Sequence, residues 1–332
     1  MTEKLKWGII GAGNVVEFKS GPSLQQAEDS QVIAMFSRTY SKAKNLAEKM
    51  NIPRVYNTKE EFFSDPEIEA VYISTPPDSH YNYAIEAIEA GKHVLVEKPM
   101  ATSVTECEGM TIKAAEKNVV LMTAYYRRFW PSYCKIKSII DSGEIGNIIY
   151  LSLNFFCNGY PGSGTPVPWR LEKEISGGGL FVDVGSHRLD MANFLVGNFK
   201  KVIAIATRYH SELKVEDTVG LLAETETNAH VHGYFSFNLP VTYDSMQIVG
   251  TRGRIIMDVF DSNNIELQKD DKRIIYTIKR TGPTHLGLVN HFIKVVKKQQ
   301  KPMIDGLTGT HINRIIEASY KSAETGNWIE IF

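Results

Sequence analysis

The chain has 332 residues, of which 43% are hydrophobic and 23% are charged. This length and composition exclude a disordered chain and favour two packed domains. The formal net charge is −1, from 37 basic and 38 acidic residues, with no long block of either sign. The sequence therefore lacks the electrostatic pattern of a nucleic-acid or anionic-membrane partner, and we expect a small diffusible substrate instead.

Cysteine use and hydropathy bear on the cellular compartment. Cys107, Cys134 and Cys157 are odd in number and widely spaced, which argues against a disulfide framework and against a structural zinc site. The first six residues contain no apolar signal core, and no apolar run approaches the length of a membrane span. We expect a cytoplasmic protein with no membrane segment and no bound metal.

The first part of the chain alternates apolar strands with amphipathic helices. Strands are predicted at residues 7–10, 32–36, 70–74, 93–96 and 119–122, and helices at 41–50, 59–64, 81–90 and 105–117. Such alternation is typical of a parallel sheet with crossover helices. We therefore predict an α/β Rossmann domain over residues 1–124.

A glycine-rich turn follows the first strand. Gly11 and Gly13, with Asn14 and Val15, join that strand to a helix. This arrangement lets a pyrophosphate approach the backbone at a helix N-terminus. Val16 stands where the dinucleotide fingerprint has its third glycine or alanine, and a plain strand-turn-helix is the alternative interpretation.

The end of the second strand bears on the choice of cofactor. It carries Ser37 and Arg38 instead of the acidic residue that would hold a ribose 2′-hydroxyl. A hydroxyl beside a guanidinium suits a 2′-phosphate, which favours NADP. Because an arginine can also stack on adenine, NAD stays open.

Two further strand ends carry candidate site residues. Thr75 and Pro76 follow the third strand with His80 close by, and Glu97 and Lys98 follow the fourth. Ligands of open parallel sheets lie at the carboxyl ends of the strands. An ammonium group there can donate to a substrate oxygen and stabilise a developing alkoxide. A surface Lys-Pro turn is the alternative for Lys98, and a helix cap for His80.

The remaining residues, 125–332, predict an α+β domain with an open, predominantly antiparallel sheet. His230 and His232 share a strand face without a third partner at metal spacing, so we assign both to the sheet surface. A sheet of this size needs a cover on its open face, which a second copy of the chain would supply. Strands are predicted at residues 148–156, 201–207, 219–226, 230–238, 245–250 and 254–259, and helices from 131 and at 312–322.

The run after Gly177–Gly179 carries a candidate acid/base pair. If it is helical, Asp183, His187 and Asp190 stand at i, i+4 and i+7 on one face, and Ser176 caps the helix. A carboxylate one turn from an imidazole keeps the ring ready for proton transfer. A solvated pair without a catalytic role is the alternative.

Taken together, these motifs resemble in order and spacing the Gfo/Idh/MocA oxidoreductases, the group of glucose-fructose oxidoreductase and inositol 2-dehydrogenase. The resemblance covers nearly the whole chain. It implies a nicotinamide cofactor, substrates among sugars and polyols, and a homodimer or homotetramer formed through the open sheet. The motifs that carry it are Gly11-x-Gly13, Thr75-Pro76 with His80, Glu97-Lys98-Pro99, Arg127-Arg128-Phe129, Trp169-Arg170 and Gly177 through His187.

The resemblance also assigns residues to roles. The catalytic lysine of the family falls on Lys98, and its aspartate and histidine fall on Asp183 and His187. We expect Arg127 or Arg128 to face the ligand crevice, with an interdomain salt bridge as the alternative. The candidate cofactor-binding residues are Gly11, Gly13, Asn14, Val15, Ser37, Arg38, Thr75, Pro76, His80, Glu97, Lys98, Arg127, Trp169 and Arg170.

We therefore predict hydride transfer between NAD(P) and a secondary alcohol of a sugar, polyol or cyclitol. His187 would act as general base, Lys98 would hydrogen-bond the same oxygen, and Asp183 would orient a hydroxyl or the imidazole. One alternative is a glycosidase that uses the nicotinamide for transient oxidation. Another is a dinucleotide- or sugar-sensing regulator that resembles the galactose-pathway repressor, although the presence of all three residues disfavours a sensor.

Overall fold

The computed structural model describes residues 3–159, 165–259 and 263–332. The chain forms two compact units: Met1–Tyr126 with Thr281–Thr310, and Arg127–Arg280 with His311–Phe332. The division predicted from the sequence, 1–124 and 125–332, differs from these units in one main respect. Residues 281–310, which were expected in the second domain, belong to the first unit.

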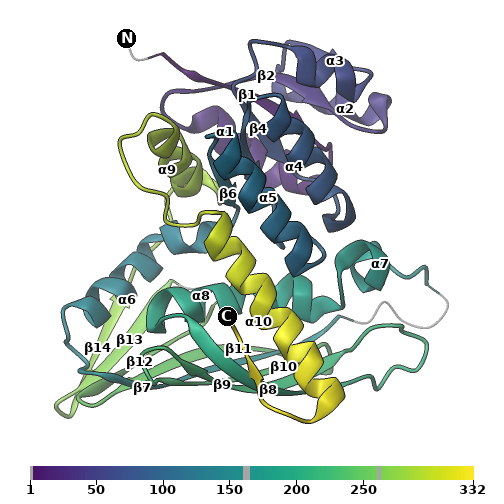
Figure 1. Cartoon of the computed structure of the whole chain (residues 1–332). Helices are drawn as coiled ribbons and strands as arrows, with labels where there is room; N and C mark the ends of the chain where they lie inside the picture. Colours follow the sequence, from purple (N-terminus) through teal and green to yellow (C-terminus); the bar gives the residue numbers. More distant parts are fainter. Residues whose placement is uncertain (1–2, 160–164, 260–262) are drawn as a thin grey trace. The chain divides into compact units, whose positions relative to one another are not determined.

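The first unit contains a six-stranded parallel sheet of order β3-β2-β1-β4-β5-β6 (Figure 1). Every neighbouring pair of these strands is parallel, which confirms the predicted Rossmann architecture. Strand β3 was not predicted, because it has only three half-buried residues. The strands are β1 (Leu5–Ile10), β2 (Ser30–Phe36), β3 (Arg54–Tyr56), β4 (Ala70–Ile73), β5 (His93–Val96) and β6 (Leu121–Thr123).

Helices pack on both faces of this sheet. On one face α4 (His80–Glu89) and α5 (Val104–Glu116) lie side by side (Figure 1), and their apolar residues share a core with Ile10. Strand side chains alternate between faces, so Trp7 points the other way and packs against Phe292 of α9 (Leu286–Val296), with ring centroids 4.9 Å apart. Helix α9 also packs on α1 (Gly21–Gln26). The remaining helices of this unit are α2 (Tyr40–Met50) and α3 (Lys59–Ser64).

The second unit contains a nine-stranded sheet of order β14-β13-β12-β11-β7-β10-β9-β8-β15. Its described pairs are antiparallel except β7 with β10, which confirms the predicted, mainly antiparallel sheet. The strands are β7 (Ile148–Asn158), β8 (Phe199–Thr207), β9 (Thr218–Thr225), β10 (His230–Ser236), β11 (Asn238–Gly250), β12 (Gly253–Met257), β13 (Asn264–Lys269), β14 (Lys272–Thr277) and β15 (Ile329–Glu330). The sequence had not predicted β13, β14 and β15.

One face of this sheet is covered by helices and the other is open. Helices α6 (Pro131–Asp141), α8 (Ser186–Val196) and the later part of α10 (Gly306–Thr325) lie over the covered face (Figure 1). The open face carries exposed apolar side chains on four strands: Ile205, Leu222, Tyr234 and Tyr243. His230 and His232 lie on the same face, as expected for sheet surface.

Among the described residues, no helix is long and apolar enough to cross a membrane. Within the same residues, no cluster of His, Cys, Asp or Glu side chains could hold a metal ion. Cys107, Cys134 and Cys157 form no disulfide bond.

Candidate active site

The glycine turn after β1 is crowded at Gly11 and open at Gly13. Gly11 has φ +111°, and a Cβ there would lie 2.6 Å from the carbonyl oxygen of Ser74, so the close approach of β1 to β4 requires glycine. A Cβ at Gly13 would meet nothing within 4 Å, and Gly13 and Asn14 are exposed. The chain then turns through Val16, which is fully buried. This open backbone at a helix start fits a pyrophosphate.

The end of β2 lies beside this turn, since the backbone N–H of Gly11 donates to the carbonyl of Phe36 over 2.9 Å. Ser37 is half-buried and its hydroxyl oxygen accepts from the N–H of Thr39. Arg38 is exposed. An exposed guanidinium at this strand end suits an anionic group on the adenine ribose.

His80 connects two of the predicted site turns. Its ring nitrogens lie 2.9 Å from the carbonyl oxygens of Thr75 and Pro99, one nitrogen to each, and the side chain is fully buried. Burial lowers the pKa of His80, and a neutral ring can donate to only one of the two carbonyls at a time. The imidazole therefore lies between the turn after β4 and the turn after β5, and it can donate a hydrogen bond to either.

Glu97 and Lys98 follow β5, and the peptide bond from Lys98 to Pro99 is cis. The buried Glu97 accepts at Oε1 from the hydroxyl of Tyr72 over 2.5 Å and from Nε2 of His285 over 3.0 Å. Its Oε2 accepts from the backbone N–H of Lys98 over 3.2 Å. Burial alone would raise the pKa of Glu97, but the hydrogen bonds and the charge of its neighbours hold it below the usual value. The carboxylate is thus an ionised support beneath Lys98.

In the second unit the prediction that Ser176 caps the helix of Asp183 is wrong. Ser176 instead ends the short helix α7 (Lys173–Ser176), and its hydroxyl donates to the carbonyl of Glu172 over 2.9 Å. The chain then passes through Gly177, whose φ is +81°, a backbone conformation that glycine adopts without strain.

The next two glycines make room for side chains from elsewhere in the second unit. A Cβ on Gly178 would clash with the hydroxyl of Tyr320, and one on Gly179 would lie 2.6 Å from Oε1 of Glu216. That same Oε1 accepts from the Tyr320 hydroxyl over 2.8 Å and from the Gly179 N–H over 3.1 Å. Burial raises the pKa of Glu216 to about 6, against these hydrogen bonds.

Asp183 lies in a π turn (Phe181–Gly185), and His187 lies in the first turn of α8. The predicted helix is therefore interrupted here, and such single π turns are frequent at functional sites. The Nε of Arg170 donates to Oδ2 of Asp183 over 3.0 Å, and the guanidinium also lies 4.3 Å from the ring centre of Trp169. The predicted Trp169-Arg170 motif and the separately predicted Asp183 thus form one cluster within the second unit.

Asp190, the third residue of the predicted face, has a structural partner. Its Oδ1 accepts from Nε and Nη2 of Arg128 over 2.9 and 2.6 Å, and burial raises the pKa of Asp190 to about 6 against that guanidinium. Arg127 is also buried, and its Nη1 donates to the carbonyl of Val259 over 2.9 Å. Arg128 thus forms a salt bridge, but within the second unit, so the predicted interdomain bridge is wrong for this arginine. A cofactor contact from Arg127 stays a prediction.

Sequence reasoning missed four residues of these clusters. A tyrosine inside a buried strand needs a partner for its hydroxyl, so Tyr72 could have been flagged from its place in β4. Glu216 and Tyr320 carry no local motif. Neither does His285, whose contact with Glu97 spans 188 residues of sequence.

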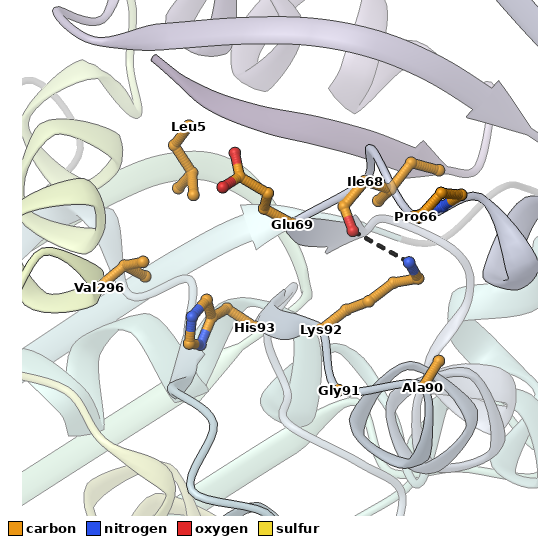
Figure 2. Close-up of a pocket in the computed structure, with 9 residues that line it drawn as sticks. All are labelled: Leu5, Pro66, Ile68, Glu69, Ala90, Gly91, Lys92, His93 and Val296. Atoms are coloured by element: carbon orange, nitrogen blue, oxygen red, sulfur yellow. Dashed lines mark hydrogen bonds between the residues drawn. The ribbon is translucent and has the colours of Figure 1, made fainter. Parts of the chain in front are cut away.

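The pocket drawn in Figure 2 lies at the N-terminal ends of the strands of the first sheet, opposite the carboxyl ends that carry the candidate site residues. It has a volume of about 330 Å³ and is lined by residues at the strand starts, among them Leu5, Glu69 and His93. The ammonium of Lys92 donates to the carbonyl of Ile68 over 2.9 Å. Because cofactors bind at the carboxyl ends of parallel strands, this pocket is not the dinucleotide site.

Comparison with known proteins identifies the family. Residues 5–125 match the family described as "Oxidoreductase family, NAD-binding Rossmann fold" (GFO_IDH_MocA), and residues 133–256 match the "GFO/IDH/MocA C-terminal domain". Oxidoreductase P35 of Formosa agariphila is 32% identical over 311 residues, 93% of this chain and 91% of that protein. Trans-1,2-dihydrobenzene-1,2-diol dehydrogenase of Mus musculus is 33% identical over 255 residues, 75% of this chain and 73% of that protein.

Solved structures share the fold over the full length. Levoglucosan dehydrogenase in complex with NADH and levoglucosan superposes with a TM-score of 0.90 at 24% identity, covering 99% of this chain and 100% of that one. Aldose-aldose oxidoreductase from Caulobacter crescentus complexed with glycerol gives 0.88 at 24% identity, with the same coverage. The fold class and the family resemblance are thus confirmed. The chain belongs to the Gfo/Idh/MocA family and is a NAD(P)-dependent oxidoreductase.

Proposed function

We propose that the protein catalyses hydride transfer between a nicotinamide cofactor and a secondary alcohol carbon of a sugar, polyol or cyclitol. The observation that carries this proposal is the family match across both domains in a chain that has Lys98, Asp183 and His187. Relatives support the substrate class, since one is named for a dihydrodiol and another is solved with levoglucosan.

The cofactor, when bound, supplies the hydride acceptor or donor, and the protein supplies binding and orientation. The open backbone at Gly13 supports a pyrophosphate site formed with Gly11, Asn14 and Val15. The exposed Arg38, next to Ser37, supports NADP as the preferred cofactor. Further contacts proposed for the cofactor are Thr75, Pro76, Lys98, Arg127, Trp169 and Arg170.

Three side chains would handle the reacting hydroxyl. During oxidation His187 takes the hydroxyl proton, and the ammonium of Lys98 donates a hydrogen bond to the same oxygen and stabilises the developing alkoxide. Asp183, held by Arg170, orients a substrate hydroxyl or the imidazole. We assign His80 and Glu97 to positioning. The ring nitrogens of His80 lie at hydrogen-bond distance from two backbone carbonyls, and both carboxylate oxygens of Glu97 accept hydrogen bonds from other residues of the protein.

One experiment separates this proposal from its competitors. Purified protein is incubated with NAD or NADP and a panel of sugars, polyols and diols, and reduced nicotinamide is followed by absorbance. Net reduction supports the dehydrogenase. Sugar release without net reduction indicates a glycosidase with transient oxidation. If the protein gives neither net reduction nor sugar release, the result indicates a sensing regulator.

We also propose a homodimer or homotetramer, because the open face of the second sheet exposes Ile205 (72%), Leu222 (44%) and Tyr243 (50%). A second copy of that face would cover them. Sedimentation equilibrium tests this proposal, and a monomer would contradict it. The three free cysteines support a reducing compartment, which we propose to be the cytoplasm.

A further inference from the structure

His285 is a buried histidine that the proposed mechanism does not use. It precedes α9 and is 1% exposed. Its backbone N–H donates to Oγ of Ser23 over 3.0 Å, its Nε2 lies 3.0 Å from Oε1 of Glu97, and its ring lies 4.1 Å from that of Tyr126, centre to centre. The backbone of His285 is therefore held by Ser23, and its imidazole is held by Glu97 and Tyr126, all within the first unit.

The two oxygens of Glu97 have different partners. Oε1 accepts from His285 and from the hydroxyl of Tyr72, while Oε2 accepts from the backbone N–H of Lys98. A carboxylate is rigid and planar, so donors that fix one oxygen also fix the other. Hydrogen bonds to an ionised acceptor in a buried site are among the strong ones. The position of the Lys98 main chain thus depends on two donors that do not touch it.

Stability alone gives a poor account of this histidine. Among the described residues, Nδ1 of His285 is buried and has no hydrogen-bond partner, and a buried polar atom left unpaired costs stability. An apolar ring would keep the ring contact with Tyr126 without that cost. An apolar ring would, however, lack the N–H at Nε2 that donates to Glu97.

We propose that His285 and Tyr72 are positioning residues that act through Glu97 to hold Lys98 in its reactive place. This inference rests on the proposed role of Lys98 as the residue that hydrogen-bonds the reacting oxygen. A displacement of about 1 Å at a reacting group can cost about 100-fold in rate, so a support of this kind affects turnover far more than it affects cofactor binding.

The test compares His285→Phe, which keeps an aromatic ring but removes the donor, with His285→Gln, which restores an N–H near the place of Nε2. Tyr72→Phe removes the second donor. His291→Phe is the matched control, because His291 lies within α9, the helix that His285 precedes, and contacts Gln300 and Met303 instead of Glu97. Each variant is assayed for kcat, for the primary isotope effect with the panel's substrate deuterated at the carbon that gives up the hydride, for cofactor Kd and for melting temperature.

For His285→Phe we expect kcat to fall about 10- to 100-fold, a larger isotope effect as hydride transfer becomes limiting, and a nearly unchanged cofactor Kd. His285→Gln recovers most of the loss, and His291→Phe matches the wild type. Hydrogen exchange of the peptide that contains Lys98 needs no substrate. It should speed up in His285→Phe and Tyr72→Phe, but not in His285→Gln.

The variant Lys98→Met distinguishes a failure of the proposed function from a failure of the positioning role of His285. If this variant keeps wild-type turnover, the proposed function falls and this inference falls with it. If it is inactive while His285→Phe keeps the wild-type kcat, isotope effect and amide exchange, only the positioning role is overturned. A lowered melting temperature with an unchanged kcat and isotope effect would likewise leave His285 a purely structural residue and contradict the proposal.

Discussion

The Nε of Arg170 donates to Oδ2 of Asp183 over 3.0 Å, in a pair whose side chains are 41% and 22% exposed. Exposed ion pairs contribute only about 0 to 1 kcal/mol to stability. The pair therefore orients the Asp183 carboxylate far more than it stabilises the fold. We predict that Arg170→Met lowers kcat/KM at least about tenfold while the free energy of unfolding changes by less than about 1 kcal/mol.

Steady-state kinetics and urea denaturation of the same preparation check this prediction. Arg170→Lys serves as the comparison, since it keeps the charge but loses the planar fork of the guanidinium, and its activity should be intermediate. An Arg170→Met enzyme that is destabilised but fully active per folded molecule would contradict the assignment.

Alanine at the two glycines of the first turn should affect stability to very different extents. Gly11→Ala places a Cβ 2.6 Å from the Ser74 carbonyl at a φ of +111°, so we expect a loss of stability of at least about 1 to 3 kcal/mol. Gly13→Ala points its Cβ into open space and should change stability by no more than about 0.5 kcal/mol.

The same Gly13→Ala variant should nevertheless weaken cofactor binding about tenfold or more, because its methyl group occupies the space where the pyrophosphate is proposed to meet the backbone. Thermal unfolding and a fluorescence titration with the cofactor check both parts of the glycine prediction. Wild-type cofactor affinity in Gly13→Ala would argue against a pyrophosphate site at this turn.

Cofactor choice should depend on Arg38. Its guanidinium is exposed at the end of β2, and hydrogen bonds between charged groups contribute about 1.5 to 3 kcal/mol. We predict that Arg38→Ala raises the Kd of NADP about 10- to 100-fold and leaves that of NAD almost unchanged. Isothermal titration with both cofactors measures the difference, and a loss of affinity shared equally by the two would contradict NADP preference.

Glu216 should make stability depend on pH. Burial raises its pKa from 4.5 to about 6 in the folded protein, so the folded state favours the protonated form. The resulting stabilisation is present below about pH 4.5 and is lost as the pH rises through about 6. Glu216→Gln mimics the protonated form, and it should be more stable than the wild type by about 2 kcal/mol at pH 8 but nearly equal at pH 4.5. Denaturant unfolding at both pH values checks this, and an equal difference at both would contradict it.

The hydrophobic pattern of the sequence correctly predicted the strands in which almost every residue is buried. Apolar runs such as residues 70–74 and 93–96 gave parallel strands, and the alternation of strands and helices gave their order. Strand β3 was not predicted because it has only three residues, all of them half-buried. The glycine run was correctly seen as a place of close approach, but the groups that approach are Tyr320 and Glu216, and neither is near it in sequence.

Contacts between distant residues set the limit of prediction for the site. The strand ends that carry Gly11, Thr75 and Lys98 were found because topology brings carboxyl ends of parallel strands to one edge. The support behind them was not found, since His285 reaches Glu97 across 188 residues and no periodicity records such a contact. For the same reason residues 281–310 were expected in the wrong unit.

The central claim is that Lys98 and His187 act on one substrate oxygen without being needed to bind the cofactor. The most direct measurement is the turnover number and the cofactor Kd of Lys98→Met and His187→Asn, each assayed with the substrate that the panel identifies. The account predicts that kcat falls about 100- to 10,000-fold in each variant while the cofactor Kd stays close to that of the wild type. Turnover that persists in either variant, or cofactor affinity that collapses in step with turnover, would contradict it.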